Sequence, residues 1–136
     1  MIRFYEYSAL KKHFVLIDGR SLDISRFKKR DVVHALCLQY GADALAVLEE
    51  SDGADFGICA FGRDGLPSPA CKALLACSVA FADVLGVKAF HSKDYTVSDC
   101  DGTHSARIEV HLGETKSVSI DSLPAIEVLN LGDLVE

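Results

Sequence analysis

The chain has 136 residues, 49% of them apolar, and a formal net charge of −6. This length fits one ordinary domain, and an apolar content of this size argues against a disordered chain. The negative charge argues against nucleic acid and anionic membranes, because both need a basic face, and no apolar run approaches the roughly 20 residues that cross a bilayer.

The first third of the chain predicts two strands and a helix. Residues 2–7 and 13–19 have the apolar alternation and aromatic content of strands, and a short link between them allows a hairpin. Residues 25–41 place apolar side chains at helical spacing, and Gly41 is a suitable stop signal.

The middle of the chain predicts two more strands and a second helix. Residues 43–50 and 54–62 are apolar runs of strand length separated by a turn. Residues 69–85 predict a helix that Ser68 caps and Pro69 starts, since proline loses no hydrogen bond at the first helical position. The polar residues of this helix are Lys72, Ser78 and Asp83.

The last third of the chain predicts four strands. Residues 93–100 and 103–113 flank Asp101-Gly102, which is a good hairpin signal. The remaining strand-like segments are residues 116–120 and 125–131.

The second helix decides the predicted architecture, because a helix that is apolar nearly all round must be covered nearly all round. We predict an α+β domain in which a strongly curved, mainly antiparallel sheet of about eight strands wraps around this central apolar helix, with one outer helix. The alternative is an open sheet with helices on one face.

Cys71 is the candidate reactive residue, because it falls in the predicted first turn of the central helix. Unpaired amide groups and the positive end of the helix dipole favour a thiolate there. The alternative is a small apolar residue that begins the buried stripe of this helix.

The other cysteines and the histidines suggest structural roles. Cys37, Cys59 and Cys77 sit in apolar patterns and predict core positions, whereas Cys100 lies at a hairpin and should be exposed. Five cysteines at irregular spacing predict reduced thiols in the cytoplasm, and the absence of a C-x2-C pair argues against a metal site. We place His13 at a strand start, and His104 and His111 on an outward strand face.

The order of these features resembles the N-terminal half of diaminopimelate epimerase, from Met1 to about Glu114. The matching stretches are YSALKKHFVLIDG, LCLQYGADALAVLEESDGADFGICAFGRDG, CKALLAC, FADVLGVK and YTVSDCDGTHSARIEVHLGE. The resemblance implies a sheet wrapped around a helix and a cofactor-independent enzyme. In that family one cysteine from each homologous half acts as base or acid at the substrate α-carbon, and Cys71 falls on the N-terminal one.

The chain departs from the family's substrate-binding motifs. It has Lys-Lys-His-Phe in place of Gly-Asn-Asp-Phe, Phe-Gly-Arg-Asp-Gly in place of Phe-Asn-Ala-Asp-Gly, and Cys-Lys-Ala-Leu in place of Cys-Gly-Asn-Gly. The changes introduce Lys12, His13, Arg63 and Lys72, which either hold a different anionic or amino-acid-like ligand or are solvated.

The family's second half, with its second cysteine, has no counterpart in the sequence. We therefore expect residues 1–136 to form a single half-domain that is completed by a homodimer or by a separate second-half protein. The functional prediction is a cofactor-independent racemase or epimerase with Cys71 as catalytic residue. The alternative is an inactive epimerase-like binding or interaction protein.

Overall fold

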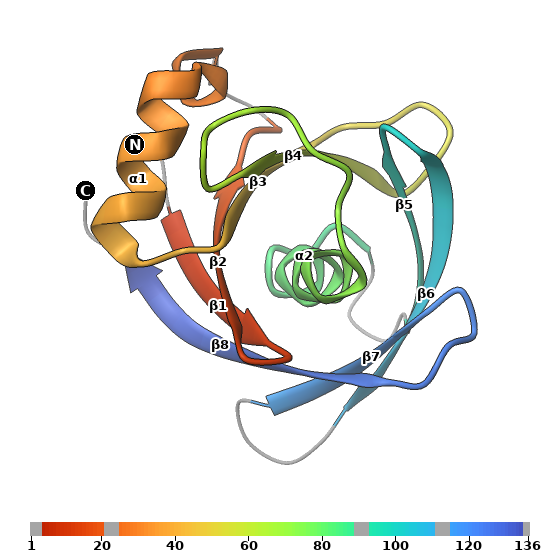
Figure 1. The fold of residues 1–136 in the computed structure, drawn as a ribbon. Helices are drawn as coiled ribbons and strands as arrows, with labels where there is room; N and C mark the ends of the chain where they lie inside the picture. Colours follow the sequence, from red (N-terminus) through yellow and green to blue (C-terminus); the bar gives the residue numbers. More distant parts are fainter. Residues whose placement is uncertain (1–3, 21–24, 89–92, 111–114, 135–136) are drawn as a thin grey trace.

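The computed structural model describes residues 4–20, 25–88, 93–110 and 115–134, and within them eight strands close into a barrel around one helix (Figure 1). The strands are β1 Phe4–Ala9, β2 Lys12–Asp18, β3 Ala44–Glu49, β4 Phe56–Gly62, β5 Asp94–Asp99, β6 Gly102–Val110, β7 Thr115–Ile120 and β8 Ile126–Leu134. The helices are α1 Arg30–Tyr40, which follows a 3-10 turn at Ser25–Lys28, and α2 Lys72–Val84.

Each strand pairs with its neighbour in the sequence, and β8 closes the barrel by pairing with β1. The β2–β3 and β4–β5 pairs are parallel and the other described pairs are antiparallel. The mainly antiparallel curved sheet is therefore confirmed, and the curvature is complete enough to join its two edges. An open sheet would have left α2 exposed on one side.

The barrel interior is filled by α2, whose residues 73–82 are all buried. The ring of Phe81 lies with its centroid 4.8 Å from that of Tyr5 and 5.8 Å from that of Tyr7, both on β1. Ser78 satisfies its hydroxyl within the helix by donating to the carbonyl of Leu74 at 2.8 Å. No helix in the described part of the chain has the length and apolarity of a membrane span.

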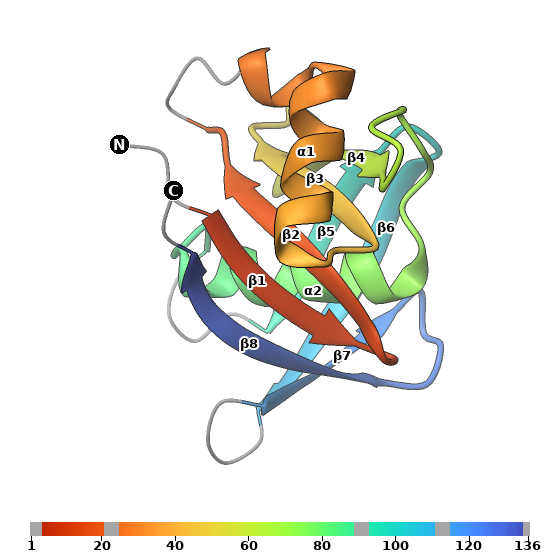
Figure 2. The ribbon, with the colours of Figure 1, turned by 60° about the vertical axis from the view of Figure 1, so that its left-hand side comes forward.

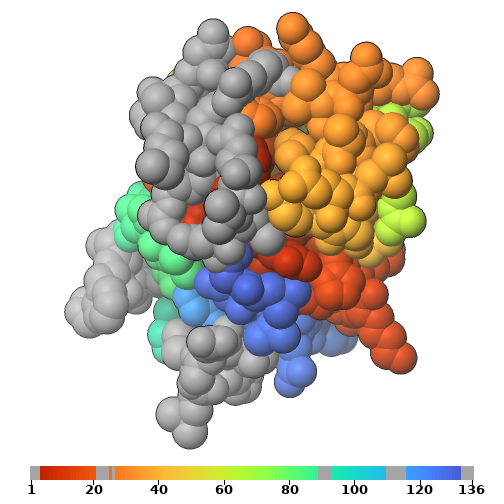
Figure 3. All heavy atoms as spheres, turned by 90° about the vertical axis from the view of Figure 1, so that its left-hand side faces the viewer, coloured from red at the N-terminus to blue at the C-terminus, as the bar shows by residue number. Residues whose placement is uncertain are grey.

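The outer helix α1 covers the outside of β1, β2 and β3 (Figures 2 and 3). Its buried face contributes Val33 and Cys37 to a second apolar cluster against the sheet. Gly41 ends the helix with a φ of 63°, the left-handed conformation that glycine adopts without strain. The predicted stop at Gly41 is confirmed.

One end of the barrel, which we call the mouth, is the end at which α2 begins. Figure 2 shows the β1–β2, β5–β6 and β7–β8 turns at this end, together with the loop of residues 63–71 that leads into α2. Because α2 is enclosed along its length, its first turn reaches solvent only at the mouth.

The predicted start of the central helix is wrong by three residues, because α2 begins at Lys72. The amide of Ser68 donates to the carbonyl of Ala60 at 3.0 Å, and Pro67 bridges to Phe61, which keeps this segment extended beside β4. The hydroxyl of Ser68 donates to the carbonyl of Pro69 and caps no helix. Ser68 also precedes Pro69, and a residue before proline is sterically disfavoured in the helical conformation.

We predict that Phe81→Ala lowers the free energy of unfolding by about 3–5 kcal/mol, because it removes a fully buried ring from the centre of the barrel. Leu38→Ala, on the exposed face of α1, should change it by less than about 0.5 kcal/mol. Urea unfolding of the two variants measures this difference. Equal effects would contradict the central packing of α2.

Candidate functional site

Cys71 is exposed at the mouth and is the N-cap residue of α2. Its backbone is extended, with φ −72° and ψ 165°, and its carbonyl accepts the amide hydrogen of Leu75 at 3.0 Å. No side chain caps this helix, so the amide groups of its first turn point toward the mouth without a side-chain acceptor. The thiol therefore stands beside a helix end that favours negative charge.

Beside Cys71, the side chain of Lys72 joins a chain of ionisable groups. Its ammonium lies 3.0 Å from Oδ2 of Asp121, which follows β7, and Nδ1 of His104 on β6 lies 2.7 Å from the same oxygen. The other oxygen of Asp121 accepts the amide hydrogen of Ser105 at 3.0 Å. Lys72 is therefore neutralised by a carboxylate of this chain.

The chain of ionisable groups ends at Asp99, the last residue of β5. The side chain of Asp99 is only 2% exposed, and its Oδ1 lies 3.4 Å from Nε2 of His104. Within the described residues, Oδ2 of Asp99 and Nε2 of His104 are buried and have no hydrogen-bond partner. The imidazole is thus held between two carboxylates inside the mouth.

The prediction that His104 faces outward is wrong. His104 pairs with the buried residue Val97 and shares the face of Ala106 and Ile108, which are both buried. Alternate residues of a strand share a face, so the apolar residues Ala106 and Ile108 assign His104 to the interior. His111, the other histidine predicted to face outward, lies outside the described residues.

The environment of Asp121 strongly lowers the pKa of its carboxyl group. Hydrogen bonds from His104 and then from Lys72 lower the pKa of Asp121 to about 2. Asp121 and Ser122 have φ values of 52° and 64°, a conformation that residues other than glycine adopt at a cost. The paired carboxylate therefore holds a strained turn over the start of α2.

Two of the other predicted ligand residues meet at Asp43, just before β3. Arg63 donates to Oδ1 of Asp43 at 2.8 Å and to the carbonyl of Ala42 at 3.0 Å. The backbone amide of His13 donates to Oδ2 of Asp43 at 2.9 Å, and its ring lies 3.5 Å from a carboxylate oxygen of Glu6. Arg63, like Lys72, is therefore paired with an acidic side chain.

Lys12, the first residue of β2, is exposed. The other predicted site residues therefore fall into two groups. Lys72 lies next to Cys71 and pairs with Asp121, whereas His13 and Arg63 both contact Asp43. The loop of residues 63–71 connects the two groups. Its Gly65 packs tightly against α1, because an added Cβ would come within 2.2 Å of the carbonyl oxygen of Arg30.

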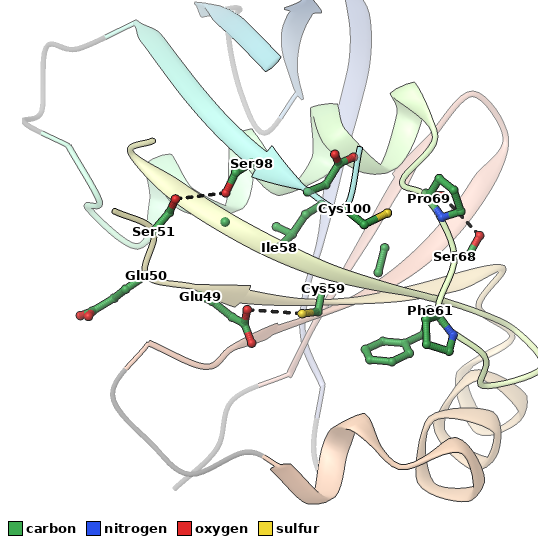
Figure 4. A pocket seen from close by; sticks show the side chains of 14 residues that line it. Glu49, Glu50, Ser51, Ile58, Cys59, Phe61, Ser68, Pro69, Ser98 and Cys100 are labelled. Carbon is green, nitrogen blue, oxygen red and sulfur yellow. Dashed lines mark hydrogen bonds between the residues drawn. The ribbon is translucent and has the colours of Figure 1, made fainter. Parts of the chain in front are cut away.

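A cavity of about 520 Å³ opens in the barrel wall beside the mouth (Figure 4). It lies where β4 and β5 separate, because only Phe56 and Gly57 of β4 pair with β5. Its lining includes Cys59 and Cys100 but excludes Cys71. Within the described residues, three smaller cavities of about 330 to 490 Å³ exclude Cys71 as well.

The predicted core position of Cys59 is wrong, because Cys59 lines this cavity. Its thiol is half-buried and donates to Glu49 at 3.3 Å (Figure 4), and Glu49 also pairs with Lys28. Burial, followed by the nearby Glu49, raises the pKa of the Cys59 thiol. The core positions of Cys37 and Cys77 and the exposure of Cys100 are confirmed.

Burial also raises the pKa of the Cys37 thiol to about 11 and raises that of Cys77. These thiols are sealed from solvent and remain protonated near neutral pH. Among the described residues, no three His, Cys, Asp or Glu side chains are arranged to hold a metal ion.

Comparison with solved structures identifies the fold. A phenazine biosynthesis protein of the PhzF family from Bacillus anthracis matches with a TM-score of 0.68 and 13% identity, over 88% of this chain and 40% of that one. Methylitaconate-delta-isomerase matches with a TM-score of 0.65 and 16% identity, over 96% of this chain and 40% of that one. The chain thus has the fold of a part of these proteins, a barrel closed around a helix.

Comparison with known sequences confirms the resemblance to diaminopimelate epimerase. The enzyme of that name from Flavobacterium psychrophilum is 29% identical over 135 residues, which cover 97% of this chain and 49% of the relative. The chain therefore spans about half the length of the epimerase that it matches. No family profile matches the chain.

We predict that Asp121→Asn destabilises the fold at neutral pH and that this effect disappears in acid. The pKa of Asp121 is lowered on folding to about 2, so its stabilisation is complete above the ordinary carboxyl pKa and is lost as the pH falls toward 2. The unfolding free energies of wild type and variant should converge between about pH 4 and pH 2.

Urea unfolding at a series of pH values measures this convergence. Asp52→Asn, at an exposed position in the β3–β4 turn, is the matched control and should show no comparable loss at neutral pH. A difference between wild type and Asp121→Asn that stays constant down to pH 2 would show that Asp121 is not stabilised by its partners.

Proposed function

We propose that this chain is one half of a cofactor-independent isomerase that inverts the α-carbon of a small amino-acid-like substrate, with Cys71 as its acid–base group. The observation that carries the proposal is the position of Cys71, exposed at the start of a helix that is otherwise enclosed. The similarity to an epimerase over nearly the whole chain supports the same class of reaction.

The chemistry follows from the geometry of the mouth. The Cys71 thiolate removes the α-proton from one face of the substrate and becomes a thiol, and a thiol on the opposite face donates its proton to the carbanion and becomes a thiolate. The uncapped amide groups at the start of α2 are suitable donors for the substrate carboxylate. The reaction also needs a second thiol on a facing surface, for which we propose a second copy or a second-half protein.

The four predicted ligand residues have unequal roles in this proposal. Lys72 and Arg63 already pair with Asp121 and Asp43, so an anionic ligand has to compete with those carboxylates. Lys12 is exposed, and the His13 ring is 48% exposed, so these two side chains are the more accessible ones. We propose His13 as the principal contact for the ligand's second polar group.

A non-catalytic role is the second candidate, and the pairing of Lys72 and Arg63 favours it. A mouth whose cations are neutralised by the chain itself offers less charge to a small anion and suits a binding or interaction protein. Five free cysteines are compatible with the cytoplasmic location that we propose for either role.

Hydrogen exchange at the substrate α-carbon tests the enzymatic proposal. The wild-type protein in D2O should incorporate deuterium at the α-carbon of at least one member of a panel of amino acids, followed by NMR. Cys71→Ser should lower the rate by about 100-fold or more, since an acid–base group has been removed. Cys100→Ser, which changes the other exposed thiol, is the matched control and should keep the rate.

Absence of exchange with every substrate in the panel would favour the non-catalytic role. Exchange that Cys71→Ser leaves unchanged would show that another group performs the proton transfer.

A further inference from the structure

Three loops around the mouth carry large apolar side chains that are exposed. Leu10 in the β1–β2 turn is 63% exposed, Leu66 in the loop before α2 is 44% exposed, and Leu123 in the β7–β8 turn is 49% exposed. We call these residues the rim leucines. Apolar side chains gathered around one end of a molecule are typical of an interaction surface.

The same rim carries opposite charges on opposite sides of α2. Lys11 and Lys12 are exposed at the β1–β2 turn, whereas Asp101 is exposed at the β5–β6 turn. Figure 1 shows these two turns on opposite sides of α2, and Figure 2 shows both at the mouth. A two-fold axis across the mouth can therefore bring the lysines of each copy against Asp101 of the other.

We propose that the mouth is the docking surface for a second copy of this chain, in a closed two-fold dimer that pairs Lys11 and Lys12 with Asp101 of the second copy. The dimer covers the rim leucines and places the two Cys71 thiols on either side of one enclosed space. The catalytic consequence of this inference rests on the proposed function, whereas dimerisation itself involves no substrate.

Local charge complementarity favours a second copy as the occupant. The chain has a net charge of −6, so two copies repel each other in general, and opposite charges that meet locally offset this repulsion. A two-fold interface is self-complementary, and the separation of lysines from aspartate across the mouth supplies both of its charge pairs at once. The interface also supplies a facing surface for Cys71, which is exposed at the mouth of the single copy.

The β1–β2 turn has the shape and chemistry of a contact element. Figure 3 shows the red segment of this turn projecting from the body of the molecule. Leu10 and Lys11 have φ values of 50° and 63°, in a turn that Asn-Gly would form with less strain. A groove of about 490 Å³ between this turn and β8, lined by Leu10, Ala125 and Leu129, is large enough to receive a rim leucine of the second copy.

Charge reversal on one side of the mouth tests this dimer. Analytical ultracentrifugation should show that wild type is dimeric, and that K11E/K12E and D101K each raise the dimer Kd by at least about tenfold, because each places like charges opposite one another. An equimolar mixture of these two variants should restore the dimer, since both charge pairs are then opposite again. Leu38→Asp, on the exposed face of α1, should leave the dimer intact.

Circular dichroism and urea unfolding first establish that each variant is folded. A wild-type chain that stays monomeric overturns the proposal, as does a mixture of the two variants that fails to associate. A wild-type dimer that shows no hydrogen exchange with any substrate would uphold the interface while rejecting the catalytic function. Hydrogen exchange catalysed by a monomeric protein would uphold the catalytic function while rejecting the interface.

Discussion

The burial of α2 is the constraint on which the rest of the structure depends. Ten consecutive residues of this helix are buried, so no face of it is left for solvent. A barrel closed by the β1–β8 pair satisfies this requirement, and it leaves the helix ends as the only points where α2 meets water. The exposure of Cys71 follows directly, because Cys71 lies at the end of α2 that emerges from the barrel and solvent can reach it there.

Much of the fold could be predicted from residue patterns, because burial and alternation are local signals. The apolar character of residues 73–82 predicted the enclosed helix, and Gly41 predicted the end of α1. The start of α2 could not be found in this way, since the pairing of Ser68 with Ala60 depends on a strand eight residues earlier and keeps the segment extended. Local capping preferences gave way to a tertiary hydrogen bond.

The candidate site was less predictable, because its electrostatics come from contacts between distant segments. Lys72 and Asp121 are separated by 49 positions, and Arg63 and Asp43 by 20, so composition alone does not show that these cations are paired. His104 is different, since strand alternation alone assigns it to the interior. In the Asp99–His104–Asp121 arrangement, strand alternation in the sequence therefore predicts the inward position of His104. The contacts of Asp99 and Asp121 with His104 are seen only in the structure.

The central claim is that Cys71 works against a second reactive group across the mouth. A short bifunctional thiol reagent applied to the Cys100→Ser protein tests it most directly, because Cys71 is then the exposed thiol that the described residues offer. The account predicts a covalent dimer joined through Cys71 of both copies, identified by mass spectrometry. Failure to link the two Cys71 residues in a protein that is dimeric in solution would contradict it.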